Sequence, residues 1–553
     1  MEKVSRRRFL FGAAAVTAGA AVAPLAVGCS SQAKTESGNE TTSGGRWSWS
    51  LAPQAIDDSK IGETISCEIL ICGYGSAGVP AATYAAANGA DVVVLTAGNA
   101  VEALGQECAV FNSPLDGEYG ASYDPTYWMK RLVMEGLGAI DMPATGVIYE
   151  RSGDAMHWLT EHVKDEMPYV VGTDRAGDGI NDASHDESAM YTHLSYTWPA
   201  PDVEDATSAR YKGFPMFLNA AAKRAEQDGA RVLFSTPLEQ LVQDESGAVI
   251  GGIGKNKDGE YVKVLASKGV VLATGDFHQD EEMLECFCPD MCGDLFSRNP
   301  NGNCLGGGHK AAYWAGAYLN PAGSYKLGLS WPHNHESSEF PPQAWSNIPY
   351  LRVNKNGKRY TCEQLASHGT YGTAPICLAD ARQPGSIGYQ ILDSKYGELI
   401  DPAKFEAEVA RDAIYVADTL EELAEIIEVD VDGLLETVKR YNELCEKGID
   451  EDCGVDAKFL ASTSVTNPPF YCMHHPVYKQ NVGGGLSTNE YQQVYDANQQ
   501  VIPGLYAAGL IRSGWSGHFY ARSGFTGTSK MTAMVGGMIC VKNILGTEAE
   551  SFS

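Results

Sequence analysis

The sequence lacks the long hydrophobic runs, paired cysteines and basic excess that mark several common classes of protein. After residue 29, no stretch reaches the roughly 18 apolar residues that a membrane-spanning helix needs. The cysteines form no CxxC pair and no CxxCH motif, so neither a c-type haem nor a disulfide framework is predicted. Acidic residues number 70 against 41 basic ones, which disfavours binding to nucleic acid or anionic lipid. What remains is the composition of an ordinary globular α/β enzyme, with no internal repeat.

The first 29 residues are predicted to be an export signal. Residues 5–10 read SRRRFL, a twin-arginine pattern, and a weakly apolar run extends from residue 11 to residue 28. Ala26-Val27-Gly28-Cys29 resembles a lipoprotein processing site, and a mitochondrial-type or buried helix is the alternative. We therefore expect location in the cell envelope, in the periplasm or on the outer face of the cytoplasmic membrane, with a lipid anchor at Cys29. Residues 30–46 are rich in Ser, Thr and Gly and predict a flexible tether.

A glycine-rich turn between two apolar strands is the strongest local motif. Residues 67–72 and 92–95 are predicted strands, residues 79–88 a helix, and the turn is Gly73-Tyr74-Gly75-Ser76-Ala77-Gly78. In a Rossmann βαβ unit these glycines allow a tight turn, close approach of a pyrophosphate, and close packing of helix on strand. The helix N-terminus then offers N–H groups to the phosphates. The motif predicts dinucleotide binding.

The rest of the chain predicts further strands and helices. We expect helices at 154–159 and 214–228, an irregular segment at 172–205, and a strand at 230–234. A hairpin is predicted at 249–254 and 260–265, followed by an apolar strand ending in Ala273-Thr274-Gly275. Acidic helices are predicted at 419–427 and 431–448, and residues 501–509 are predicted to be a last strand running into a glycine turn. The chain thus predicts an α/β fold.

The order of these segments resembles the large family of FAD-dependent oxidoreductases related to fumarate reductase and succinate dehydrogenase flavoproteins. Urocanate reductase and the ketosteroid dehydrogenases are members. Besides the three glycine turns, the resemblance rests on residues 351–354, 357–360 with Glu363, 417–424 and 484–486. It implies a discontinuous Rossmann-like FAD-binding domain at 64–320 and 470–548, with an inserted α+β cap domain at 321–469 closing over the flavin.

The resemblance also implies the cofactor, FAD, and the residues that hold it. The predicted cofactor-binding residues are Gly73, Gly75, Ser76, Ala77, Gly78, Thr96, Ala273, Thr274, Gly275, Gly484, Gly509, Thr526, Gly527 and Thr528. The helix after Gly527 is expected to point its N-terminus at the flavin N1–C2=O edge.

Several positions depart from the family pattern. Thr96 stands where many members have an acid for the adenosine ribose, and Leu510 where many have Glu. The family's cap arginine, the proton donor that follows the acid matching Glu363, is missing from residues 364–368. The substrate-binding His before Gly484 is also missing, although His518 and Arg522 match a pocket motif. One arginine is too few to hold both ends of a short dicarboxylate.

The family implies hydride transfer from flavin N5 to an activated C=C, with an acid protonating the neighbouring carbon. We expect Tyr520, Arg522 and His518 as catalytic candidates, each with a purely structural role as the alternative. The expected acceptor is a small organic molecule in anaerobic metabolism: an enone, a cinnamate-like acid, a polyphenol or a steroid. Alternatives are a ketone or ketosteroid dehydrogenase, a fumarate-type reductase, and a flavin-free binding lipoprotein.

Electrons are expected from a separate donor, a membrane cytochrome or quinol-linked protein, because the chain has no haem motif and no evident second flavin domain. No metal site is predicted. An iron–sulfur cluster at Cys286, Cys288, Cys292 and Cys304 is left open, because the spacing C-x-C-x3-C-x11-C matches no common pattern.

Overall fold

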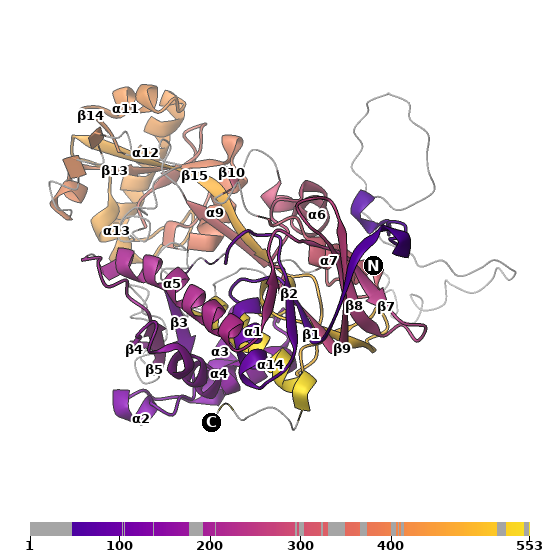
Figure 1. The fold of residues 1–553 in the computed structure, drawn as a ribbon. Coiled ribbons are helices and arrows are strands. Elements are labelled where there is room, and N and C mark those ends of the chain that lie inside the picture. The colour runs from indigo at the N-terminus through magenta and orange to yellow at the C-terminus, as the bar shows by residue number, and fades with distance from the viewer. Residues whose placement is uncertain are drawn as a thin grey trace, which may run out of the picture. The chain divides into compact units, whose positions relative to one another are not determined.

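The computed structural model describes residues 47–101, 103, 105–136, 138–175, 192–204, 206–292, 296–297, 303–321, 324–329, 349–364, 373–399, 405–406, 409–410, 414–516, 527–546 and 552. Among them, no helix combines the length and the apolar character needed to cross a bilayer. Figure 1 labels the elements.

The main sheet has eight strands, and its centre is parallel. The order β16-β17-β9-β1-β2-β6 contains five strands that run in one direction, with β16 antiparallel at the edge. The bounds are β1 (Ile61–Cys72), β2 (Val92–Leu95), β6 (Arg231–Leu233), β9 (Tyr261–Leu272), β16 (Gln493–Tyr495) and β17 (Val501–Ala507). The strand predicted at 92–95 is confirmed residue for residue, and β17 confirms a strand within the segment predicted at 501–509.

Strand β9 joins two features that the sequence analysis treated separately. Its first half pairs with β8 (Val249–Lys255), which in turn pairs with β7 (Leu238–Gln243), so the predicted hairpin is confirmed. Its second half continues between β1 and β17 up to Leu272, just before the predicted Ala273-Thr274-Gly275 turn.

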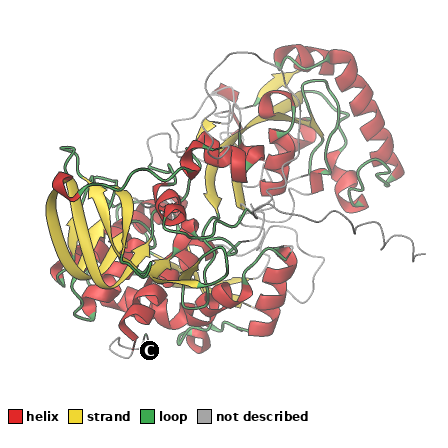
Figure 2. Cartoon of the chain, turned by 90° about the vertical axis from the view of Figure 1, so that its right-hand side faces the viewer, coloured by secondary structure: helices red, strands yellow, loops and turns green. Residues whose placement is uncertain are grey.

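Both faces of the parallel sheet are buried, which is typical of doubly wound proteins. Along β1, Ile69 and Ile71 pack into one hydrophobic cluster, while Leu70 and Cys72 pack into another on the opposite face. The first cluster includes side chains of α1 (Gly78–Ala87), α4 (Met142–Val163), α5 (Ala206–Gln227) and α14 (Thr528–Leu545), and Figure 2 shows helices packed along the strands. Helix α1 is rich in alanine, which allows α5 and α14 both to contact it closely.

The region predicted to be irregular at 172–205 contains two strands, so that prediction is wrong in part. Strand β4 (Val170–Arg175) and strand β5 (Thr192–Thr197) form an antiparallel three-stranded sheet with β3 (Glu107–Val110), in the order β3-β5-β4. Leu194 and Tyr196 alternate with more polar residues and are fully buried, which fixes β5 against the core. The turn-forming and polar residues around these strands masked the alternation.

A second mixed sheet is centred on β15 (Phe470–Gly483), which was not predicted. This strand pairs with β10 (Phe296–Ser297), β11 (Ser324–Leu329), β13 (Ile387–Leu392) and β14 (Tyr415–Ala417), and β12 (Arg352–Val353) pairs with β13. Helices α11 (Leu420–Ile426) and α12 (Val431–Lys447) confirm the acidic helices, beginning after the N-caps Thr419 and Asp430. The domain boundaries stay predictions, although β15 shares a sheet with strands of the expected cap.

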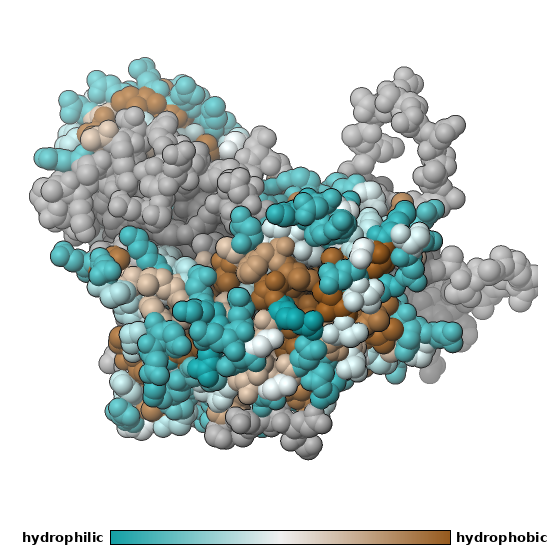
Figure 3. Space-filling model, in the orientation of Figure 1, coloured by the Kyte–Doolittle hydropathy of each residue, from teal (hydrophilic) through white to brown (hydrophobic). Residues whose placement is uncertain are grey.

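The remaining helices are short or peripheral. They are α2 (Asp116–Tyr119), α3 (Pro125–Glu135), α6 (Glu281–Phe287), α7 (Gly307–Trp314), α9 (Thr373–Ala381) and α13 (Ala457–Thr463), with 3₁₀ turns at Ser48–Ser50, Asp58–Lys60, Pro289–Met291, Pro384–Ser386, Ser394–Leu399 and Gly509–Ile511. Figure 3 shows hydrophilic residues over much of one face of the molecule and hydrophobic ones gathered near its middle.

Candidate cofactor-binding site

The predicted glycine turns meet at one edge of the main sheet. Cys72 is the register partner of Leu95 on one side and of Leu272 on the other, and Leu272 is also the partner of Ala507. These four residues end β1, β2, β9 and β17, so the turns that follow them lie side by side. Ligands of open parallel sheets bind at this carboxyl edge.

Close backbone contacts explain why two of the predicted glycines are required. Gly73 adopts φ +106°, and a Cβ there would lie 2.2 Å from the carbonyl oxygen of Ala273. A Cβ on Gly78 would lie 1.9 Å from the carbonyl oxygen of Gly73. A side chain at Gly73 would therefore push the turn after β1 away from the turn after β9, and one at Gly78 would push the start of α1 away from its own turn.

Helices α1 and α7 begin at these turns without a side-chain cap; α14 also lacks one, but its N-cap Gly527 lies against β3, and its middle packs on the turns. The first N–H groups of α1 and α7 carry the positive end of the helix dipole and suit a phosphate or another anionic group. The Thr274 hydroxyl oxygen is buried beside α7, where a Cβ on Gly308 would lie 2.1 Å from it, and no described residue forms a hydrogen bond with it. The uncapped helices, the close-packed glycine turn at residues 73–78 and the unpaired Thr274 hydroxyl together fit a dinucleotide such as FAD.

The turn at Gly484 lies against the turn at Gly509. The Gly484 N–H donates to the carbonyl oxygen of Leu510 at 3.1 Å, and the Leu486 N–H donates to that of Ile511 at 3.0 Å. The Gly484 carbonyl oxygen is 2.8 Å from Nε2 of His309, which is completely buried on α7. Burial lowers the pKa of His309 to about 4, so the ring is neutral near pH 7 and donates this hydrogen bond.

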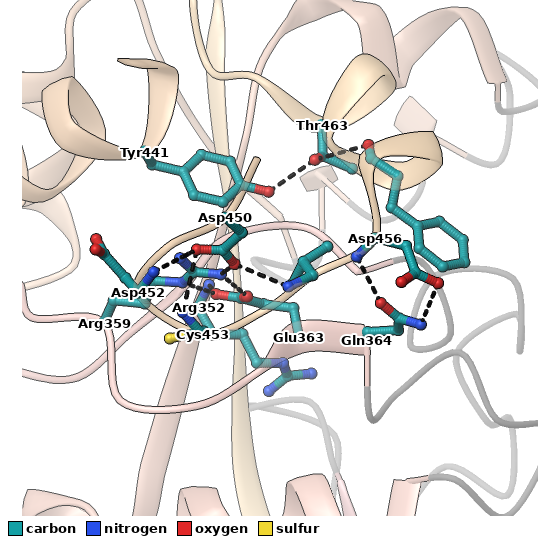
Figure 4. Close-up of polar contacts among 12 residues, drawn as sticks. Arg352, Arg359, Glu363, Gln364, Tyr441, Asp450, Asp452, Cys453, Asp456 and Thr463 are labelled. Atoms are coloured by element: carbon teal, nitrogen blue, oxygen red, sulfur yellow. Dashed lines mark hydrogen bonds and ion pairs between the residues drawn. The ribbon is translucent and has the colours of Figure 1, made fainter. Parts of the chain in front are cut away.

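A buried ion-pair network lies inside the expected cap, as Figure 4 shows. The Arg359 guanidinium contacts Glu363 at 2.6 Å and Asp450 at 2.7 Å, and Arg352 contacts Asp380 at 2.7 Å. Burial pushes the pKa of Asp450 upward, but Arg359 and the backbone N–H groups of 453 and 455 outweigh it and hold the pKa at about 2. Burial raises the pKa of Glu363, against the pull of Arg359.

Comparison with known proteins settles the family. A family model described as an FAD binding domain matches residues 68–526, which is most of the chain. The chain belongs to this FAD-binding family. It is an FAD-dependent oxidoreductase, and its α/β fold and its cofactor are as predicted.

Curated relatives match most of the chain at low identity. A probable fumarate reductase of Shewanella frigidimarina is 24% identical over 83% of this chain and 72% of its own length. Vinyl phenol reductase of Lactiplantibacillus plantarum is 25% identical over 82% of this chain and 92% of its own length. Digoxin reductase of Eggerthella lenta is 26% identical over 95% of this chain and 94% of its own length. A flavocytochrome c3 fumarate reductase in its open conformation has a similar fold, with a TM-score of 0.66 and 21% identity. The match covers 92% of this chain and 83% of that one.

The structure brings most of the predicted FAD-binding residues to this edge. Thr96 is buried at the end of β2, where its N–H bonds to the Leu233 carbonyl oxygen. Gly527 is the N-cap of α14, and Thr528 is the first residue of that helix. The individual contacts of these residues with FAD stay predictions. His518, Tyr520, Arg522 and Thr526 lie outside the described residues, so the catalytic candidates also stay predictions.

Two buried residues of this FAD-binding site were missed by the sequence analysis. His309 follows a triple glycine, and only that glycine run could have drawn attention to it. Arg512 is completely buried, its Nε donates to the Thr488 hydroxyl at 2.9 Å, and both terminal nitrogens have no hydrogen-bond partner among the described residues. Burial lowers the pKa of Arg512 to about 10, so it remains charged at pH 7.

Proposed function

We propose that the protein is an exported reductase of an activated C=C bond in an organic acceptor that is larger and less anionic than fumarate. Bound FAD supplies hydride chemistry, and the polypeptide must bind and orient the acceptor and deliver a proton. The reduction of C=C bonds is also what the names of the fumarate, vinyl phenol and digoxin reductases indicate for those relatives.

The main observation in favour of a larger, less anionic acceptor is that the arginines of the cap are already ion-paired. Every arginine that the structure describes between residues 321 and 469 is already ion-paired with a carboxylate. These arginines are Arg352, Arg359, Arg382 and Arg440. A short dicarboxylate needs several cations to hold its two ends. The described part of the cap offers no uncommitted guanidinium for that purpose.

Residues just before the missing family arginine are also committed to the protein itself. Glu363 is fully buried and accepts from Arg359, and the Gln364 amide exchanges hydrogen bonds with Asp456 at 2.8 Å in both directions. This arrangement supports an acceptor whose recognition depends on shape and apolar contact. Vinyl phenol and digoxin, named by two relatives, are uncharged molecules of that kind.

The test is anaerobic steady-state turnover with a reduced dye as electron donor. We expect kcat/KM for vinyl phenols, cinnamate-like acids or steroidal enones to exceed that for fumarate by at least about 100-fold, the cost of about 3 kcal/mol in transition-state binding. Fumarate turnover equal to or faster than every larger acceptor would overturn the proposal. Faster oxidation of saturated ketones with an oxidised dye would instead favour the dehydrogenase alternative.

Export and the electron donor are part of the same proposal. The SRRRFL pattern and Cys29 support an envelope location with a lipid anchor, and a separate cytochrome or quinol-linked donor follows from the absence of a haem motif in the sequence. Direct, rapid oxidation of NADH by the isolated chain would contradict the separate donor.

A further inference from the structure

Three side chains with metal-binding chemistry lie together just beyond the FAD-binding turn at residues 273–275. Asp276 and His278 follow that turn, and Cys304 comes from the segment that leads into α7. One ligand atom from each of the three lies within 4.8 Å of the other two. Asp276 and His278 are each 2% exposed, while Cys304 is half-buried.

Hydrogen bonds hold the three residues in place. Oδ1 of Asp276 lies 2.8 Å from Nδ1 of His278, and Oδ2 accepts from the Val482 N–H at 2.9 Å. The Gln279 side chain accepts from the Cys304 N–H at 2.9 Å, and the Gln279 N–H donates to the Cys304 carbonyl oxygen at 3.0 Å. Cys304 is therefore fixed to the residue that follows His278, although 25 positions separate it from Gln279.

The donor set and its charge suit a divalent ion. Thiolate, imidazole and carboxylate together favour zinc and similar borderline transition metals over magnesium or calcium. His278 hydrogen-bonds with Asp276, whereas the neighbouring Lys310 and Lys479 pair with Asp280 and Glu281. A carboxylate and a metal-bound thiolate carry two negative charges, which match a divalent cation.

The separations also suit a metal. Tetrahedral zinc with bonds of about 2.0–2.3 Å holds its ligand atoms roughly 3.4–3.7 Å apart, so small side-chain rotations from a 4.8 Å grouping are sufficient. Oδ1 of Asp276 and Nδ1 of His278, now 2.8 Å apart, would move slightly apart when both bind the ion.

We propose that Asp276, His278 and Cys304 bind one divalent transition-metal ion of the zinc class, which links the 273–275 turn to the entry of α7. The site is distinct from a four-cysteine iron–sulfur cluster, because its nitrogen and oxygen donors come from outside the cysteine group. It does not depend on the identity of the organic acceptor.

The test uses Co²⁺ as a spectroscopic probe on the full-length holoenzyme. We expect one Co²⁺ per chain, a thiolate-to-cobalt charge-transfer band in the difference spectrum, and displacement of that band by Zn²⁺. Cys304→Ser should abolish the band, and Asp276→Asn should weaken Co²⁺ binding by more than about 10-fold, because it removes a ligand and not an outer partner of one. The matched control Cys286→Ser, a half-buried thiol on the neighbouring helix α6, should keep both band and affinity. Bound flavin, measured by its own absorbance, reports whether each variant is folded.

A second measurement needs no variant. Zn²⁺ should slow alkylation of Cys304 in the wild-type protein, followed by peptide mass spectrometry, while Cys286 reacts at an unchanged rate. Absence of Co²⁺ binding, a band that survives in Cys304→Ser, or alkylation of Cys304 that Zn²⁺ does not affect would each overturn the proposal.

Discussion

Replacing Arg359 with methionine should destabilise the protein strongly, because it would leave two buried carboxylates without their cation. The Arg359 side chain is 9% exposed, and its partners Glu363 and Asp450 have side chains that are 1% and 0% exposed. Removing one member of a buried ion-pair network costs about 3–5 kcal/mol, since the remaining charges keep their desolvation penalty. Methionine retains most of the aliphatic volume, so a cavity contributes little to the loss.

The assay is urea-induced unfolding followed by circular dichroism, with Arg440→Met as the matched control. Arg440 also pairs with acids, but its side chain is 44% exposed, so that variant should unfold close to the wild type. The pH dependence gives a second readout. The pKa of Asp450 is about 2, below its ordinary 3.8, so its stabilising contribution is complete above pH 4 and disappears as the pH falls through 2. Equal losses in both arginine variants would refute the reasoning.

Three further predictions concern the cofactor site and export. The pKa of His309 is about 4 in the folded protein against 6.5 in the unfolded chain, so the free energy of unfolding should fall by about 3 kcal/mol as the pH drops from 6.5 to 4. His309→Gln should flatten this pH dependence, which acid titration of unfolding can show. Gly78→Ala should lose FAD on gel filtration, whereas the control Gly307→Ala, whose Cβ would meet no atom closer than 3.8 Å, should retain it. Equal retention of FAD would contradict the role given to the glycine turn at residues 73–78. Arg6→Lys with Arg7→Lys should leave unprocessed precursor in the cytoplasm, visible by cell fractionation, and normal processing would argue against twin-arginine export.

The parallel core was predictable because its signals are local. A short apolar strand followed by a glycine turn marks β1, β9 and β17, and their order along the chain agrees with the family pattern. Strand β15 gave no such signal, since it contains Pro476 and His475 and pairs with strands far away in the sequence. Strands β4 and β5 were missed because polar and turn-forming residues surround them.

The cofactor turns could be predicted from the sequence, but side-chain clusters between distant segments could not. Arg359 and Asp450 are 91 positions apart, and Gln279 and Cys304 are 25 positions apart. Contacts between residues so far apart leave no periodic pattern in the sequence. Cys304 was grouped with the cysteines nearest in sequence, while the structure places it beside Asp276 and His278.

The measurement that tests the central claim most directly is an anaerobic visible spectrum of the mature protein purified without added flavin. The account predicts paired flavin bands that bleach on reduction and recover when a vinyl phenol, cinnamate-like acid or steroidal enone is added, with little recovery on adding fumarate. A colourless protein that cannot be reconstituted with FAD, or recovery with fumarate alone, would contradict it.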